Sequence, residues 1–242
     1  MEFFEVLERR RSIRNFSDAP VDDKIIERAL QAATLAPNSS NVQTWDFYWT
    51  SRDGSTHKQL ISACLSQGAA RTASHLIVVT ADYGKWRRSR PQILAWVDQS
   101  IQQAAPKKPN FPPSMRDYYE KLIPLMYINA FGLLGGLRWI GLRLVSLFRP
   151  IMIRPAGRRD LQEVAVKSAA LACENFVLAI TAQGAGTCMM EGFDESRVRR
   201  ALKLRRSQRV VMVIAVGHPT ERGRWGERFR IPLAEVVHRV ED

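Results

Sequence analysis

Three short stretches of this 242-residue chain contain side chains that could bind an anion or a flat ligand. The first is the run Arg10-Arg11-Ser12-Ile13-Arg14-Asn15-Phe16. Alternate residues leave an extended segment on one face, so Arg10, Ser12 and Arg14 would present two guanidiniums and a hydroxyl together. Guanidiniums suit phosphate oxygens, or a ring that gains negative charge on reduction. This run predicts an anion-binding segment, and a solvated basic helix end is the alternative interpretation.

The second stretch, residues 36–45, has the sequence APNSSNVQTW and follows a predicted helix. It gathers five small polar side chains in a loop whose backbone could bend toward a ligand. Taken alone, the stretch indicates only an ordinary turn.

The third stretch, residues 184–194, has the sequence GAGTCMMEGFD. Gly184 and Gly186 offer the backbone freedom that ends a helix. At Glu191-Gly192, a residue without a side chain would let main-chain N–H groups approach a flat ligand closely. The stretch follows a helix and has no GxGxxG spacing, so it does not match a dinucleotide-binding Rossmann turn. Near the C-terminus, Arg228 and Arg230 in RFRIP would lie on one side of another extended segment.

Helices and strands are mixed along the chain. Apolar spacing predicts two helices in the first forty residues, the second stopping near Pro37, and a nearly all-apolar buried helix over residues 164–183. Alternating or β-branched runs predict strands over residues 45–50, 76–80 and 210–216. Because these elements do not alternate regularly, they indicate an α+β protein and not a doubly wound sheet.

The middle of the chain, residues 104–155, is different in character. Four prolines and two lysines in residues 104–113 indicate a loop, and residues 122–137 contain no charge. A membrane-spanning helix needs about 20 apolar residues, and Arg138, Arg143 and Arg149 interrupt this one. An amphipathic hairpin that covers protein, or lies on a bilayer surface, therefore fits better than a span. We expect one domain over residues 1–242, with residues 104–155 as an inserted lid or surface-docking segment.

The net charge of +12 is concentrated in this middle region. Residues 85–160 hold 14 Lys and Arg against 4 Asp and Glu, which accounts for +10 of the total. The basic residues alternate with leucine runs, not with an aromatic stacking surface, so we expect no nucleic-acid partner. The three cysteines, Cys64, Cys173 and Cys188, lie far apart and form no CxxC or Cys/His cluster. They indicate reduced thiols in a cytoplasmic protein, without disulfides or a metal site, and the N-terminus reads as a helix start.

The order and spacing of RRSIRNF, APNSSNVQTW, GAGTCMMEGFD, VMVIAVGHP and RFRIP resemble the nitroreductase family of FMN-dependent oxidoreductases. The resemblance covers residues 1–82 and 160–240. It implies an α+β sandwich with a central, mostly antiparallel sheet wrapped by helices. It also implies an intertwined homodimer with its two FMN sites at the interface. Thr44 departs from the family pattern, which has proline there.

The resemblance further implies which residues bind the cofactor. Arg10, Arg11, Ser12 and Arg14 would hold the phosphate, the ribityl chain and the pyrimidine edge, and Arg228 and Arg230 would complete the phosphate clamp. The backbone near N5 and the loop from the other subunit would come from the following residues: Met190, Glu191, Gly192, Pro37, Asn38, Ser39 and Asn41.

The implied function is hydride transfer from NAD(P)H to nitroaromatic, quinone or similar electron-poor acceptors by a ping-pong mechanism. The flavin carries the chemistry, so no side-chain base is expected, and His75, His218 and Cys188 are interpreted as structural. Reductive dehalogenation, enone reduction and flavin destruction are other uses of the fold. The alternative function is a peripheral membrane-associated protein that uses residues 122–154 to dock on lipid at the inner face of the membrane.

Overall fold

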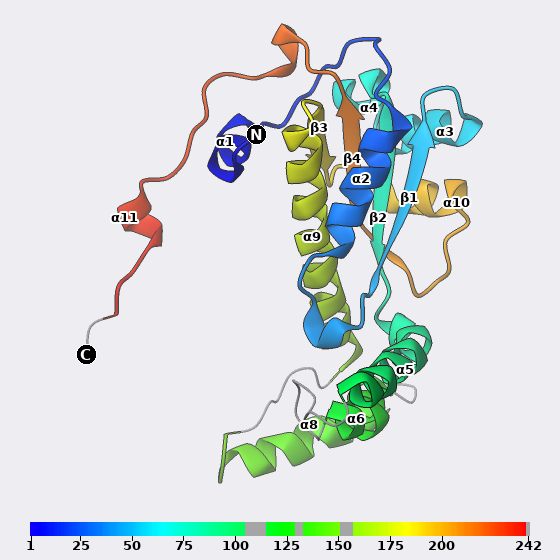
Figure 1. Cartoon of the computed structure of the whole chain (residues 1–242), viewed down its shortest axis with the longest axis vertical. Helices are drawn as coiled ribbons and strands as arrows, with labels where there is room; N and C mark the ends of the chain where they lie inside the picture. Colours follow the sequence, from blue (N-terminus) through cyan, green and yellow to red (C-terminus); the bar gives the residue numbers. More distant parts are fainter. Residues whose placement is uncertain (105–114, 129–132, 151–156, 241–242) are drawn as a thin grey trace.

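A four-stranded antiparallel sheet with the order β1-β2-β4-β3 lies at the centre of the molecule (Figure 1). The computed structural model describes residues 1–104, 115–128, 133–150 and 157–240. The strands are β1 (Trp45–Ser51), β2 (His75–Ala81), β3 (Gly186–Met190) and β4 (Arg209–Gly217). The three predicted strands are therefore confirmed. The fourth, β3, lies within the glycine-rich stretch, where no strand was predicted, and it is paired antiparallel with β4.

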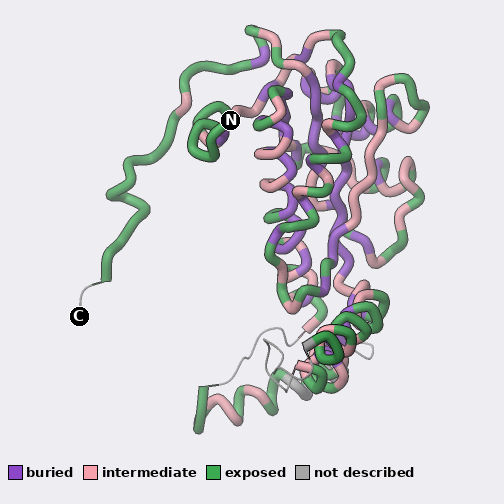
Figure 2. Tube along the Cα trace, viewed as in Figure 1, coloured by how far each residue is buried: buried purple, intermediate pink, exposed green. Residues whose placement is uncertain are grey.

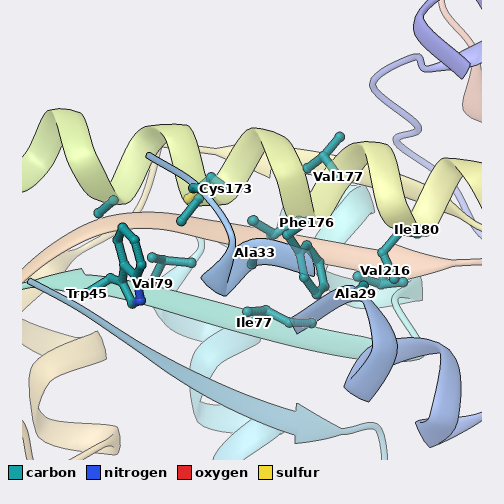
Figure 3. Close-up of a cluster of buried hydrophobic side chains, with 14 of the residues drawn as sticks. Ala29, Ala33, Trp45, Ile77, Val79, Cys173, Phe176, Val177, Ile180 and Val216 are labelled. Atoms are coloured by element: carbon teal, nitrogen blue, oxygen red, sulfur yellow. The ribbon is translucent and has the colours of Figure 1, made fainter. Parts of the chain in front are cut away.

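One face of the sheet is covered by α2 (Asp23–Thr34) and α9 (Arg158–Ala182). Figure 3 shows Phe176 and Ile180 of α9 beside Ala29 and Ala33 of α2, above Ile77 of the sheet. The small residues let α2 and α9 approach closely, and Phe176 fills the space between them with no exposed area. The buried helix predicted over residues 164–183 is thus confirmed, and it begins earlier than expected.

The other face is covered by α3 (Ser55–Ala63), α4 (Gly68–Thr72) and α10 (Glu195–Ala201). All seven residues of β2 are buried. Successive side chains of a strand point to opposite faces, so Ile77 and Val79 enter one core while Leu76 and Val78 enter the other. The observed layers confirm the predicted α+β architecture.

The middle of the chain forms a separate group of helices beyond one end of the sheet (Figure 1). After η2 (Tyr83–Lys85), α5 (Trp86–Ala104) packs against α6 (Met115–Asp117), the π-helical turn η3 (Tyr118–Leu122) and α7 (Ile123–Tyr127). A small third core joins these elements to the rest of the protein through Val42 and Leu161.

Helix α8 (Leu133–Ser146) presents an exposed apolar surface. Trp139, Ile140 and Leu144 are each about half exposed, and Phe148 just beyond the helix is 89% exposed. Among the described helices, only α9 is long and apolar enough to cross a membrane, and α9 is the central core helix. The side chain of Arg138, one of the three arginines that interrupt this apolar stretch, lies outside the described residues.

The two terminal segments meet at one side of the layers, where the N-terminal helix contacts α9, and the C-terminal arm then runs away from the layers (Figure 1). Helix α1 (Phe3–Arg9) precedes an extended segment, and the C-terminal part runs through η4 (Glu221–Gly223) into an arm that ends after α11 (Leu233–Val236). Figure 2 shows this arm almost entirely exposed. Its exposed apolar side chains include Trp225, Phe229, Leu233 and Val237.

His57 should make the stability of the fold depend on pH. Its ring is completely buried on α3, where Nδ1 lies 3.1 Å from Thr50 Oγ1, and burial lowers its pKa below the ordinary value of 6.5. The unfolded chain takes up a proton near pH 6.5 that the folded protein excludes, so stability is present above that pH and falls below it. The loss for one proton reaches at most about 1.4 kcal/mol per pH unit.

We predict that His57→Asn, which keeps a hydrogen-bonding partner for Thr50 but does not titrate, reduces this loss. Chemical denaturation at pH 7.5 and 5.5 measures it. An identical loss of unfolding free energy in the variant and the unchanged protein would contradict the role of His57.

Candidate functional site

A small cavity at one end of the sheet collects arginines from both ends of the chain. Its volume is about 180 Å³. It contains all six residues that the sequence assigned to a phosphate and pyrimidine site, together with three residues of the C-terminal arm. The lining residues are Arg10, Arg11, Ser12, Arg14, Trp225, Glu227, Arg228, Phe229 and Arg230.

Main-chain pairing positions the N-terminal side of this cavity. Ser12 forms a parallel bridge with Thr187 of β3, and Ile13 N–H donates to Thr187 O at 2.8 Å. Arg14 N–H donates to Gly223 O at 2.9 Å. A Cβ at Gly223 would lie 2.4 Å from Asn15 O, so only glycine allows the C-terminal segment to approach this closely. The alternation of Arg10, Ser12 and Arg14 thus occurs in an extended segment, as predicted.

Arg228 joins the arm to the end of α1. Its guanidinium donates to Glu8 O at 2.8 Å, to Leu7 O at 3.2 Å and to Arg10 O. These carbonyls have no partner within the helix, so the cation satisfies them and interacts favourably with the helix dipole. Burial lowers the pKa of Arg228, and the positive charges of Arg10, Arg230 and Arg11 lower it further.

The cavity carries an excess of positive charge. Five guanidiniums line it against one carboxylate, Glu227. Within the described part of the chain, none of the five forms an ion pair, and those of Arg11, Arg14, Arg228 and Arg230 donate to main-chain oxygens. Like charges gathered without counterions repel one another, so a bound anion would stabilise the arrangement. The donor set fits a phosphate group.

Trp225 is a site residue that the sequence reasoning missed. The Arg14 guanidinium carbon lies 4.4 Å from the centre of the Trp225 ring, a cation–π contact, and Arg11 donates to the next carbonyl, Gly226 O, at 2.7 Å. The contact holds the Arg14 side chain at the cavity. A tryptophan three residues before RFRIP was the available signal.

The main-chain surface predicted at Met190, Glu191 and Gly192, here called the shelf, lies at the end of β3 that is far from Ser12. Gly184, with φ of +85°, lies just after the end of α9, as expected. Strand β3 then ends at Met190, which is buried, and the next two residues, Glu191 and Gly192, are exposed. Gln67 Nε2 donates to Gly192 O at 2.6 Å. Gln67 was not assigned to the site from the sequence, and its hydrogen bond holds the main chain at Gly192.

An open cavity of about 1130 Å³ adjoins the shelf, lined in part by Glu191, Phe193, Arg159 of α9 and Met212 of β4. Strand β3 runs from this space to the arginine cavity, and a strand advances about 3.3 Å per residue. The charge of Arg14 also reaches the middle of β3, where it partly offsets the burial that raises the pKa of Cys188. One edge of the molecule therefore offers an anion site and a shelf beside an open cavity.

The loop that contains Pro37, Asn38, Ser39 and Asn41 lies elsewhere in the chain. It precedes β1, whose first residue is level with the start of β4, whereas the arginine cavity adjoins the end of β4. Nine residues of strand separate the two places, on the order of 25 Å. The structure therefore brings together the arginines of one chain but not these four residues with them.

The same loop has a strained backbone. Ser40, Asn41 and Gln43 adopt φ values of 55°, 50° and 53°, the left-handed region that favours glycine. Asn38 Oδ1 accepts a hydrogen bond from Gln43 N–H at 2.8 Å across the loop. Left-handed non-glycine residues cost on the order of 1 kcal/mol or more each, and they concentrate at binding sites.

The histidines and cysteines considered from the sequence have structural environments. His75 is buried at the start of β2 with Nε2 2.9 Å from Asp23 Oδ1, and the carbonyl of His218 accepts from Ser17 N–H. All three thiols are free and buried. Burial raises the pKa of Cys64 to about 11 and that of Cys173 to about 12.

Comparisons with known proteins agree with this fold. The model of the Nitroreductase family matches residues 7–218. An NADH dehydrogenase of Thermus thermophilus is 26% identical over 229 residues, covering 95% of this chain and 91% of that protein. A nitroreductase family protein of Streptococcus pneumoniae superposes with a TM-score of 0.66 at 22% identity, over 98% of this chain and all of that one. A protein of Exiguobacterium sibiricum crystallised in complex with FMN gives 0.68 at 20% identity, over 98% and 97%.

We predict that the thiols resist modification in the folded protein. Only the thiolate reacts, and burial keeps Cys64, Cys173 and Cys188 protonated at neutral pH. A colorimetric disulfide reagent at pH 7.5 should modify fewer than one thiol per chain within minutes, and all three after addition of denaturant. Rapid stoichiometric reaction of Cys188 in the folded protein would contradict its interpretation as a packed thiol.

Proposed function

The chain belongs to the nitroreductase family, and from this premise we propose that it is an FMN-dependent oxidoreductase. It transfers hydride from NAD(P)H to nitroaromatic, quinone or similar electron-poor acceptors by a ping-pong mechanism. The observation that carries the proposal is the arginine cavity, in which residues 10–14 and 225–230 meet. The FMN-bound relative from Exiguobacterium sibiricum supports the choice of cofactor.

Each part of the site has a distinct role in this proposal. Arg10, Arg228 and Arg230 bind the phosphate, with Arg11 and Ser12 beside them. Arg14, held against Trp225, supplies positive charge to the pyrimidine edge and stabilises the reduced, anionic ring. Met190, Glu191 and Gly192 provide the main-chain surface along the ring. When bound, FMN supplies the hydride chemistry, and the protein contributes orientation and charge.

A second copy of the chain completes the site. Pro37, Asn38, Ser39 and Asn41 lie too far from the arginines of their own chain to share a ligand with them. The C-terminal arm exposes a run of apolar residues that a stable monomer would bury, and such surfaces mark protein interfaces. We therefore propose an intertwined homodimer in which the arm lies on the partner and the loop reaches the partner's cofactor. Residues 104–155 would cover the substrate side of this cytoplasmic enzyme.

Peripheral docking on anionic lipid is a second candidate function. It rests on the exposed apolar surface of α8 and on the absence of acidic residues between positions 121 and 159 of the sequence. The helix is too short to span a bilayer, so contact would be superficial. A colourless preparation that takes up no FMN but sediments with anionic vesicles would favour this function over the first.

The purified protein should be yellow, and NAD(P)H added without oxygen should bleach it. We predict that Arg14→Ala weakens FMN binding roughly 10- to 100-fold or slows the reduction of the bound flavin, because a charge-assisted contact is lost. Arg28→Ala, an exposed arginine on α2, is the control and should change neither. Flavin absorbance and stopped-flow reduction are the measurements. Unchanged FMN content and reduction rate in Arg14→Ala would mean that the role of Arg14 is wrong.

The arm should determine the oligomeric state. Leu233→Asp combined with Val237→Asp introduces two charges into its apolar surface, and we predict a shift from dimer to monomer in light scattering, with loss of bound FMN. Glu235→Gln lies between these positions and should leave the dimer intact. A monomeric unmodified protein, or a double variant that remains dimeric, would contradict the arrangement.

A further inference from the structure

Two successive tyrosines of the middle segment contact a single serine of the loop that precedes β1. Tyr118 Oη lies 2.6 Å from Ser40 Oγ, and Tyr119 Oη donates to Ser40 O at 3.1 Å. The tyrosines come from η3, nearly eighty residues away in the sequence. Neither has a role in the function proposed above.

The π-helical turn explains how neighbouring residues reach the same target. In an α-helix, successive side chains point about 100° apart. In η3, Ile123 N–H instead donates to Tyr118 O, five residues back, and the two rings lie 5.2 Å apart and nearly perpendicular. Arg90 of α5 donates to Tyr119 O at 2.7 Å and to Glu120 O at 3.3 Å, which fixes the widened turn on α5. Such turns are frequent at functional sites.

The contacts fall on the most strained part of the loop. Ser40 has φ of 55° and ψ of 21°, and Asn41 and Gln43 are also left-handed. Strained conformations persist only where the surroundings hold them. Val42, between the strained residues, is buried in the same small core as Tyr119 and Trp86. One apolar anchor and two hydroxyls therefore hold the loop.

We propose that Tyr118 and Tyr119 are positioning residues that preset the loop for the cofactor. By holding Ser40 in its left-handed conformation, they orient Asn38, Ser39 and Asn41 before FMN arrives, so that little ordering is needed on binding. This inference rests on the proposed FMN function and assigns a task to the middle segment within it.

The test compares Tyr118→Phe and Tyr119→Phe with Tyr127→Phe, which removes a hydroxyl from the same small core. Each of the first two should weaken FMN binding about 3- to 10-fold, the effect of one neutral hydrogen bond, as measured by quenching of FMN fluorescence. Each should also accelerate amide hydrogen exchange at residues 38–43 of the FMN-free protein. Tyr127→Phe should change neither quantity, and the urea midpoint should be the same in all three variants.

Ser40→Ala provides a second, independent variant. If Tyr118 acts through the Ser40 hydroxyl, the double variant that combines Tyr118→Phe with Ser40→Ala should bind FMN no more weakly than either single variant. Fully additive effects, unchanged FMN binding and exchange, or a lowered urea midpoint without faster local exchange would each overturn the proposal. If the unmodified protein binds no FMN although exchange accelerates in the variants, the proposed function and the cofactor role of the tyrosines both fail, while their hold on the loop stands.

Discussion

The repulsion among five guanidiniums is the constraint on which the site depends. Arg10, Arg11, Arg14, Arg228 and Arg230 are drawn together by main-chain contacts, and not by carboxylates. The pairing of residues 12–14 with β3 and η4, and the hydrogen bonds of Arg228 to the end of α1, offset the electrostatic cost. Hydrogen bonds that hold charges of one sign together favour the binding of an anionic ligand. Gly223 allows the C-terminal segment to approach residues 13–15 closely.

The sheet separates the arginine cavity from the loop at residues 37–41, and this separation is why the proposed site requires a second copy of the chain. β4 extends from the strained loop at one end to the arginines at the other. Neither region is loose, since the loop is held by Val42 and the tyrosines, and the arginines by β3. The contribution of the middle segment is therefore twofold: it presents an apolar surface on α8 and it supports the loop through η3.

Much of this architecture could be read from the sequence, because apolar periodicity marks burial directly. Strands β1, β2 and β4 and helix α9 were predicted from periodicity, whereas the meeting of Arg10, Ser12 and Arg14 with Arg228 was predicted from the family resemblance. Strand β3 was missed, since Gly186 to Met190 has little strand propensity of its own and depends on β4. The left-handed residues at 40, 41 and 43 and the π-helical turn could not be predicted either. Non-glycine residues adopt these backbone conformations only where tertiary contacts hold them, and the local sequence does not show those contacts.

The span between the partners of the arginine cavity has a consequence for biosynthesis. Leu7 and Arg228 are 221 residues apart, so the cavity closes a loop that includes most of the chain. During translation, the first arginines leave the ribosome long before their C-terminal counterparts are made. The arginine cavity is thus among the last parts to assemble, and a released chain truncated before residue 225 would keep the four strands yet lack the C-terminal wall of the cavity.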